Sequence, residues 1–203
     1  STLFPYTTLF RSPYRSDAHT FNLIASPGFD RVFFNRKDLQ NVVVPLAAVA
    51  PSFTDAGVQE VAFPVGRRRT TYLAGPEWMF RHDDFIGQVS ALYEVTGRHD
   101  GYEVRAAVSA PLVQRKQSLV VNAGVTWKSA ETVDYYYGVP GFYKPDGALS
   151  PFIKLNYALP LSDRWTFTAF VHYEYLDGEI VGSPIVSDRE VVTAFAGLNF
   201  KVL

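Results

Sequence analysis

The sequence predicts an all-β protein, an antiparallel up-and-down transmembrane β-barrel of about ten strands. Apolar and polar residues alternate in several segments of similar length, and Trp and Tyr stand at the ends of the apolar faces. The connections between these segments include both tight turns and long loops. Outer-membrane barrels combine these three properties.

Composition excludes several other classes of protein. The 203 residues contain no Cys, which excludes a disulfide scaffold and thiol chemistry. The net charge is −1 with acids and bases intermixed, so the sequence predicts neither a nucleic-acid partner nor a polybasic membrane anchor. The sequence contains no run of about 18 apolar residues, the length that would suggest a transmembrane helix.

Residues 1–12 are set aside from the fold prediction. The stretch "TLFPYTTLFRS", Thr2 to Ser12, resembles the translation of a sequencing-library adapter; the alternative is an ordinary Thr- and Phe-rich strand. On the adapter interpretation the gene start is truncated, and an export signal has been lost with it. We therefore expect a single barrel domain over residues 13–203, with an incomplete N-terminal part.

The first elements are the least regular. Upstream of about residue 66 the alternation blurs, and we assume three strands there to reach the expected total. Residues 70–80 form a weaker strand candidate, because Pro76 and Trp78 interrupt its pattern.

Six later segments alternate clearly, with the period of two that places successive side chains on opposite faces of a strand. They are residues 85–96, 102–112, 119–128, 153–159, 165–176 and 192–202. Turn-forming residues join them, and no helical period appears between them. The stretch from Trp165 to Tyr175 would span about 33 Å, or about 25 Å of height at a tilt near 40°, which matches the apolar band of an outer-membrane barrel.

Alternation alone does not say which face is inside, since a soluble ligand-binding barrel has the same period with its faces exchanged. The aromatic residues favour the membrane. Trp165 and Tyr175 bracket one apolar face, Tyr93 and Tyr102 stand at the adjoining ends of two others, and Trp127 ends a fourth. Membrane interfaces select amphipathic rings at these positions. We therefore expect the apolar faces to meet lipid, with a soluble barrel as the less favoured alternative.

The opposite faces carry the residues expected to line the lumen, and these residues are mostly charged. They are Glu94, Glu103, Arg105, Lys128, Lys154, His172, Glu174 and Lys201. In a barrel of about ten strands we expect them to form ion pairs across a narrow interior.

The connection lengths predict an orientation. Residues 129–150 and 177–190 are long connections, whereas "RHDD", "QRKQ" and "PLSDR" are short. Outer-membrane barrels keep short turns in the periplasm and longer loops outside. With both termini in the periplasm the long connections fall outside, and only the short "GRHDG" departs from the rule.

Two segments carry a resemblance to a known family: "DYYYGVPGFY", residues 134–143, and "YLDGEIVGSPIVSD", residues 175–188. With the strands before, between and after these segments, residues 66–203 resemble the MipA/OmpV family of outer-membrane proteins, most distinctively over the last seventy residues. The motif positions, to which we assign no individual role, are Tyr135, Tyr136, Tyr137, Gly138, Val139, Ser183 and Pro184.

This resemblance implies a non-enzymatic barrel of ten to twelve strands in the cell outer membrane, surrounded by lipid and lipopolysaccharide. It implies a scaffold or interaction role that anchors a murein-remodelling complex, with a periplasmic lytic transglycosylase and a peptidoglycan synthase as partners. A small pore and a surface adhesin or ligand-binding barrel are the alternatives.

Three groups of residues each allow a functional and a structural interpretation. The run Tyr135–Tyr137 is either a binding platform or, as we favour, part of a loop that caps the lumen or joins the aromatic belt. The run Arg67–Arg69 either binds lipopolysaccharide phosphates or, as we favour, is a solvated charge run. His172 with Glu174 is favoured as structural hydrogen bonding over hydrolytic catalysis, because no nucleophile motif accompanies the pair. We predict no catalytic residue, no cofactor and no metal site.

Overall fold

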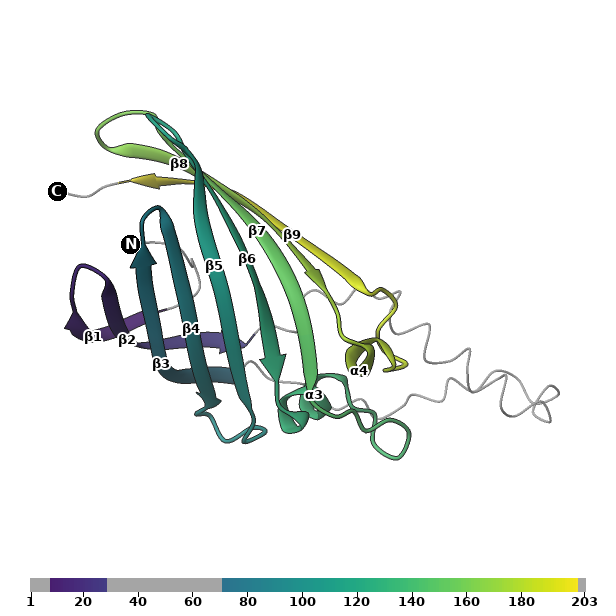
Figure 1. Cartoon of the computed structure of the whole chain (residues 1–203). Helices are drawn as coiled ribbons and strands as arrows, with labels where there is room; N and C mark the ends of the chain where they lie inside the picture. Colours follow the sequence, from purple (N-terminus) through teal and green to yellow (C-terminus); the bar gives the residue numbers. More distant parts are fainter. Residues whose placement is uncertain (1–7, 29–70, 201–203) are drawn as a thin grey trace.

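The computed structural model describes residues 8–28 and 71–200, which form one nine-stranded sheet. Each strand pairs antiparallel with the next one along the chain, from β1 to β9, and two short helices lie in the connections (Figure 1). The elements are β1 Thr8–Arg15, β2 His19–Gly28, β3 Thr71–His82, β4 Phe85–Glu94, β5 Tyr102–Gln114, β6 Ser118–Lys128, α3 Ala130–Tyr137, β7 Ala148–Pro160, β8 Trp165–Tyr175, α4 Gly178–Val181 and β9 Glu190–Phe200. The predicted all-β, antiparallel, up-and-down class is confirmed.

All six clearly alternating segments are strands, most within two residues of the predicted ends. The exception is β7, which begins at Ala148 and not at Ile153. Its first residues still alternate, with Ser150 and Phe152 buried and Leu149 and Pro151 exposed. The sequence pattern does not reveal this earlier start of β7, because the inward residue Phe152 is aromatic and the outward residue Pro151 is not a typical strand former.

The expected interruption at Pro76 and Trp78 is wrong, because β3 runs unbroken from Thr71 to His82. Trp78 faces outward, as the apolar residues of the other strands do, and is 37% exposed. Pro76 still has a local effect: the register between β3 and β4 contains no pair at Gly75 or Pro76, while Pro76 remains paired with Leu23 of β2. A proline lacks the N–H that a continuous ladder needs on one side.

Two strands, β1 and β2, lie upstream of residue 66 in the described part of the chain, where we had assumed three. β1 crosses the expected boundary between residues 12 and 13, and the adapter interpretation stays a prediction. The run Arg67–Arg69 lies outside the described residues.

The two faces of the sheet are inverted relative to a soluble protein. Large apolar side chains face outward and are exposed, as at Val89 (38%), Val108 (51%) and Leu198 (59%). Polar side chains such as those of Glu94 and Asn122 face the other way and are each only 1% exposed. We call the side with Glu94 and Asn122 the inner face. This arrangement suits a sheet whose outward side is solvated by lipid.

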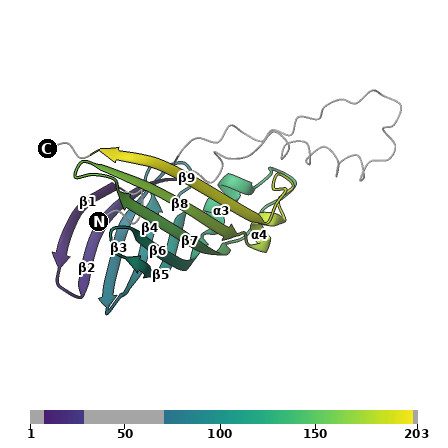
Figure 2. The ribbon, with the colours of Figure 1, turned by 90° about the horizontal axis from the view of Figure 1, so that it is seen from above.

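The sheet curls into an arc but does not close among the described residues, because β1 and β9 do not pair with each other (Figure 2). One end of the sheet, the turn end, carries the short turns after β1, β3, β5 and β7. The other, the loop end, carries the connections after β4, β6 and β8. Because nine strands alternate in direction, β1 begins at the loop end while β9 finishes at the turn end, so β1 and β9 run the same way.

Neither of the two described helices is long and apolar enough to cross a membrane.

Candidate functional site

The two long connections at the loop end fold together into one compact unit, which we call the cap: residues 129–147 and 176–189. The first contains α3, which begins where the sequence offers a helix start. Ser129 is its N-cap, with the side-chain oxygen accepting a hydrogen bond from the Thr132 N–H at 3.5 Å. Glu131 adds an acid in the first turn, and the Ser129 hydrogen bond lowers the pKa of Glu131.

Asp177 organises the second connection. Its carboxylate accepts the Glu179 N–H at 2.9 Å and so caps α4. The other oxygen of the same carboxylate accepts the Leu149 N–H at 3.1 Å, which fixes α4 to the first residues of β7. One side chain therefore ties the second connection to the start of β7.

The cap has its own apolar core, unlike the sheet beneath it. Its members come from both connections and the strand ends beside them: Val133, Tyr136, Tyr137, Ala148, Leu176 and Ile180, all at most 6% exposed. A second small cluster joins Val139 to Ile185. Burying these side chains removes apolar surface from water, which stabilises the fold of the cap.

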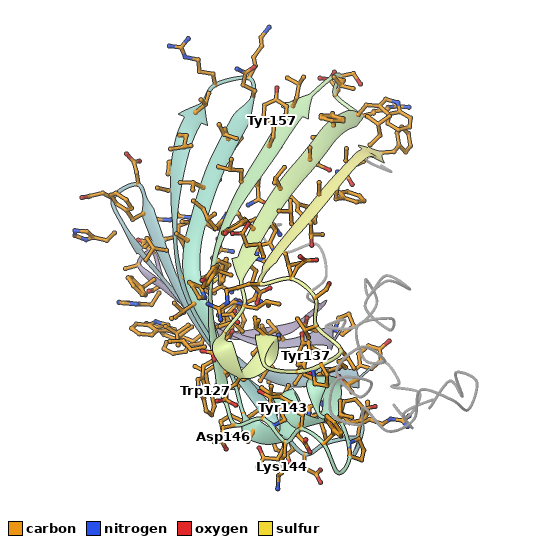
Figure 3. All side chains as sticks on the ribbon, turned by 90° about the vertical axis from the view of Figure 1, so that its right-hand side faces the viewer. Trp127, Tyr137, Tyr143, Lys144, Asp146 and Tyr157 are labelled. Carbon is orange, nitrogen blue, oxygen red and sulfur yellow. The ribbon has the colours of Figure 1, made fainter. Side chains whose placement is uncertain are left out.

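Direct hydrogen bonds join the two connections. The Ser183 hydroxyl donates to the Tyr137 carbonyl at 2.5 Å, and the Tyr143 hydroxyl donates to the Glu179 carbonyl at 2.7 Å. Figure 3 shows Tyr137, Tyr143 and Asp146 at this end, with Tyr157 at the opposite one. Burial raises the pKa of Tyr143, and the nearby carboxylates of Glu179 and Asp177 add to this effect.

The cap also reaches across the loop end. Tyr136 Oη lies 2.6 Å from Thr71 Oγ1, at the start of β3, although α3 follows β6. The His99 ring, in the connection after β4, lies 5.0 Å from the Tyr135 ring and 5.8 Å from the Tyr136 ring. α3 therefore extends over the ends of the strands between β3 and β6.

The structure thus brings the motif positions of the two family-like segments together. Tyr136 and Tyr137 are 3% and 4% exposed, so their rings form the interior of the cap, and Tyr135 is half-buried against His99. Val139 packs on Ile185, and Ser183 hydrogen-bonds to Tyr137; Gly138 ends α3 by donating its N–H to the Asp134 carbonyl at 2.8 Å. Pro184 is half-buried beside Ser183.

The residues predicted for the lumen lie on the inner face, with different surroundings. Glu94 ends β4 and accepts the backbone N–H groups of Thr96 at 2.6 Å and Arg98 at 2.7 Å. It therefore organises the turn after β4, and its carboxylate is committed to that turn.

The remaining described candidates lie on four neighbouring strands, β5 to β8. Arg105 Nη2 is 3.7 Å from Glu103 Oε1, and Arg105 Nε donates to Thr126 Oγ1 at 3.2 Å. The strand register pairs Glu103 with Lys128, Lys154 with His172, and Phe152 with Glu174. Lys201 lies outside the described residues.

Sequence reasoning missed a buried polar network on β2, β3 and β4. Asn22 donates to Glu77 at 2.7 Å, and Gln88 donates to the other carboxylate oxygen of Glu77. The signal was present, since Glu77 and Gln88 alternate with Trp78 and Val89, but the pattern of β3 was read as interrupted. No group of three potential metal ligands (His, Cys, Asp or Glu) occurs in the described part of the chain.

Aromatic pairs mark both ends of the outward face. Tyr102 and Trp127 are in contact at the loop end, with ring centres 5.1 Å apart. Trp165 and Phe200 are in contact at the turn end, with ring centres 4.9 Å apart. Two aromatic levels separated by an apolar band are typical of a protein that spans a bilayer.

Comparison with known proteins agrees with this geometry. The family model described as "MltA-interacting protein MipA" matches residues 6–202. The chain belongs to this family. Two curated relatives, both named "Putative outer membrane protein YiaT", come from Escherichia coli strain K12 and Escherichia coli O157:H7. Each is 24% identical over 144 residues, which cover 66% of this chain and 58% of the relative.

This MipA-family chain is an outer-membrane protein, and its sheet is the wall of an outer-membrane barrel. The chain spans about 58% of the length of the curated relatives that it matches. No solved structure matches it.

Proposed function

We propose that this MipA-family protein is a membrane-embedded anchor that holds a murein-remodelling complex at the outer membrane. Its first partner would be a periplasmic lytic transglycosylase, as the family description "MltA-interacting protein" suggests, and a peptidoglycan synthase would join through the same assembly. In this proposal the protein has no catalytic role, and lipid and lipopolysaccharide surround its wall.

The observation that carries the proposal is the cap. A pore needs an open mouth, whereas here α3 and α4 bury a shared apolar core over the loop end and reach as far as Thr71. A cap over this end of the sheet favours a barrel that serves as an anchor over one that conducts solutes.

The turn end offers the surface for the partner. By the usual orientation of outer-membrane barrels, short turns face the periplasm, where murein enzymes act. The turn after β5 presents Arg115 and Lys116, and the turn after β7 presents Asp163 and Arg164, all exposed. Such mixed charges suit a polar, reversible protein interface.

We further propose that additional strand structure completes the wall. Because β1 and β9 run in the same direction, a barrel that is antiparallel throughout needs an odd number of further strands between them. An open edge within lipid would leave unpaired backbone N–H and C=O groups, at a cost of several kcal/mol each.

The test is a binding measurement on the whole protein reconstituted in lipid vesicles, with a purified lytic transglycosylase as the probe. We expect saturable binding that weakens when Arg115 and Lys116, or Asp163 and Arg164, are exchanged for opposite charges. Charge reversal at Asp188, an exposed residue of the cap at the other end, is the matched control. Binding that responds only to the Asp188 change would contradict the proposal.

Single-channel recording on the same vesicles addresses the alternative function. A small pore would give stepwise conductance in the unaltered protein, and the anchor predicts none. A surface adhesin or ligand-binding barrel would instead depend on the outer side of the cap, where Phe142 is 51% exposed.

A further inference from the structure

The inner face carries an unusual combination of cations and aromatic rings on β5 to β9. In a first group of contacts, the Arg105 guanidinium lies 5.1 Å from the Phe152 ring centre, and the centres of the Phe152 and His172 rings are 5.4 Å apart. In a second group, the Lys154 ammonium lies 4.1 Å from the Phe170 ring centre, and Phe170 stacks on Phe195 with ring centres 5.7 Å apart. Cation–π contacts of this kind hold a charged group in place without neutralising it.

The two groups of contacts are adjacent in the sheet. Phe152 and Lys154 are two residues apart on β7, and Phe170 and His172 are two residues apart on β8, so each pair shares the inner face. Lys154 and His172 are direct partners in the register of these strands. Arg105 and His172 therefore meet at one ring, that of Phe152, and Lys154 lies beside them with its ammonium over the Phe170 ring.

Small residues let Arg105 reach this ring across β6. Gly124 of β6 pairs with Phe152 on one side and with Ala107 on the other. A Cβ at Gly124 would lie 2.3 Å from the Ala106 carbonyl oxygen and 2.8 Å from Ala107 Cβ, so a larger residue would disturb the sheet. No side chain at position 124 thus stands between the guanidinium and Phe152.

The inner face of β5 to β8 carries one more described cation than described acids. On the inner face of β5 to β8 the described cations are Arg105, Lys128 and Lys154, and the described acids are Glu103 and Glu174. Glu103 lies near both Arg105, at 3.7 Å, and Lys128, its register partner. Two further acids lie on the inner face. Glu77 accepts hydrogen bonds from Asn22 and Gln88, and Glu94 accepts hydrogen bonds from the turn after β4.

We propose that Arg105, Lys154 and His172 form a binding site for an oxyanion, the carboxylate or phosphate group of a small organic molecule. The Arg105 side chain is 31% exposed and would make the first contact, while Lys154, 8% exposed, supplies charge from deeper in the wall. The guanidinium fork of Arg105 matches the geometry of an oxyanion, which can accept two parallel hydrogen bonds from it. The site is separate from the cap and from the turn end, so it is independent of the anchor function.

The experiment is isothermal titration of the whole protein in detergent micelles with acetate, benzoate and inorganic phosphate, each added to a buffer that contains only chloride as its anion. Benzylamine, a cation with a ring, is the charge-reversed probe. We expect at least one of the three anions to bind, and benzylamine to show no saturable binding. Preference between phosphate and the carboxylates identifies the class of ligand, and preference of benzoate over acetate shows that the rings take part.

Variants locate the site. Arg105→Gln should weaken anion binding by roughly tenfold or more, since a charge-assisted hydrogen bond is lost, and Arg105→Lys should retain part of it. Arg81→Gln, at an exposed position near the end of β3, is the matched control and should bind as the unaltered protein does. If Arg105→Gln fails to fold, the comparison of Arg105→Lys with Arg81→Lys serves the same purpose.

Three results would overturn the proposal: no binding of any of the anions at tens of millimolar, equal binding of benzylamine, or anion binding that the Arg105 variants leave unchanged.

Discussion

Side chains are buried by opposite rules in the sheet and in the cap. In the sheet, polar residues such as Asn122 (1% exposed) are hidden and apolar ones such as Leu198 (59% exposed) are displayed. In the cap, Val133 and Ile180 are fully buried, as in a water-soluble protein. The difference indicates that lipid surrounds the sheet while water surrounds the cap, because each region hides the groups that its own solvent accommodates poorly.

A matched pair of isoleucine substitutions tests this comparison with the largest expected effect. Ile180→Ala in the cap should cost about 2–5 kcal/mol of the free energy of unfolding of the cap, since it opens a cavity in a closed core. Ile153→Ala on the outward face, where the side chain is 46% exposed, should cost much less because no sealed cavity forms.

The measurement is limited proteolysis of the cap in vesicles, combined with denaturant unfolding of the sheet. Ile180→Ala should speed cleavage within residues 129–147 while the sheet unfolds at nearly the same denaturant concentration. Equal effects of the two substitutions would remove the distinction between the regions.

A charge placed on the outward face tests the lipid side directly. Val108 is 51% exposed near the middle of β5, so Val108→Arg should destabilise the folded protein in vesicles by about 2–4 kcal/mol, because a charge is forced against acyl chains. Val95, 58% exposed just after β4 at the loop end, is the control, and Val95→Arg should cost at most about 1 kcal/mol. Denaturant titration in vesicles measures both, and a harmless Val108→Arg would show that this face meets water.

The hydrogen bond between the two parts of the cap gives a smaller effect. Ser183→Ala removes the donor to the Tyr137 carbonyl and leaves a buried acceptor without it, which costs roughly 1–3 kcal/mol. Ser187→Ala, which removes an exposed hydroxyl that donates to the Asp188 carboxylate at 3.0 Å, should change the stability by at most about 0.5 kcal/mol. Amide hydrogen exchange within α3 reports the opening of the cap, and unchanged exchange in Ser183→Ala would mean that the apolar core alone holds the connections together.

The smallest effect is a dependence of the cap on alkaline pH. Because burial and then the carboxylates of Glu179 and Asp177 raise the pKa of Tyr143, the folded cap favours the protonated phenol. The stabilisation of the cap by the protonated Tyr143 phenol is fully present below the ordinary tyrosine pKa of about 10. It is lost as the pH rises through the higher pKa that Tyr143 has in the folded protein. Cap proteolysis should therefore accelerate at high pH in the unaltered protein, and less so in Tyr143→Phe, which has no phenol to ionise. An identical pH response in both proteins would exclude Tyr143 as the cause.

Sequence reasoning succeeded where one local period decides the structure. The alternation around Val89, Val108 and Leu198 placed each of these residues on the apolar face of its strand, since a strand leaves only two choices for each side chain. The aromatic residues at the ends of these faces then indicated that they point outward. It failed at β3, where Trp78 was read as an interruption although it follows the same period. It also missed α3, although Ser129 followed by Glu131 is a helix-start signal, because the segment holds only eight helical residues between two strands.

The sequence is enough to predict the antiparallel β class, most of the strand boundaries and the outward direction of the apolar faces. The folded structure was needed to show that the two family-like segments form one cap and that Arg105 and His172 meet at the Phe152 ring beside Lys154. Separation along the chain explains why: Ser183 and Tyr137 are 46 positions apart, and Tyr136 and Thr71 are 65 apart. Contacts of that kind depend on how the sheet curls and how its ends meet, which no local period encodes.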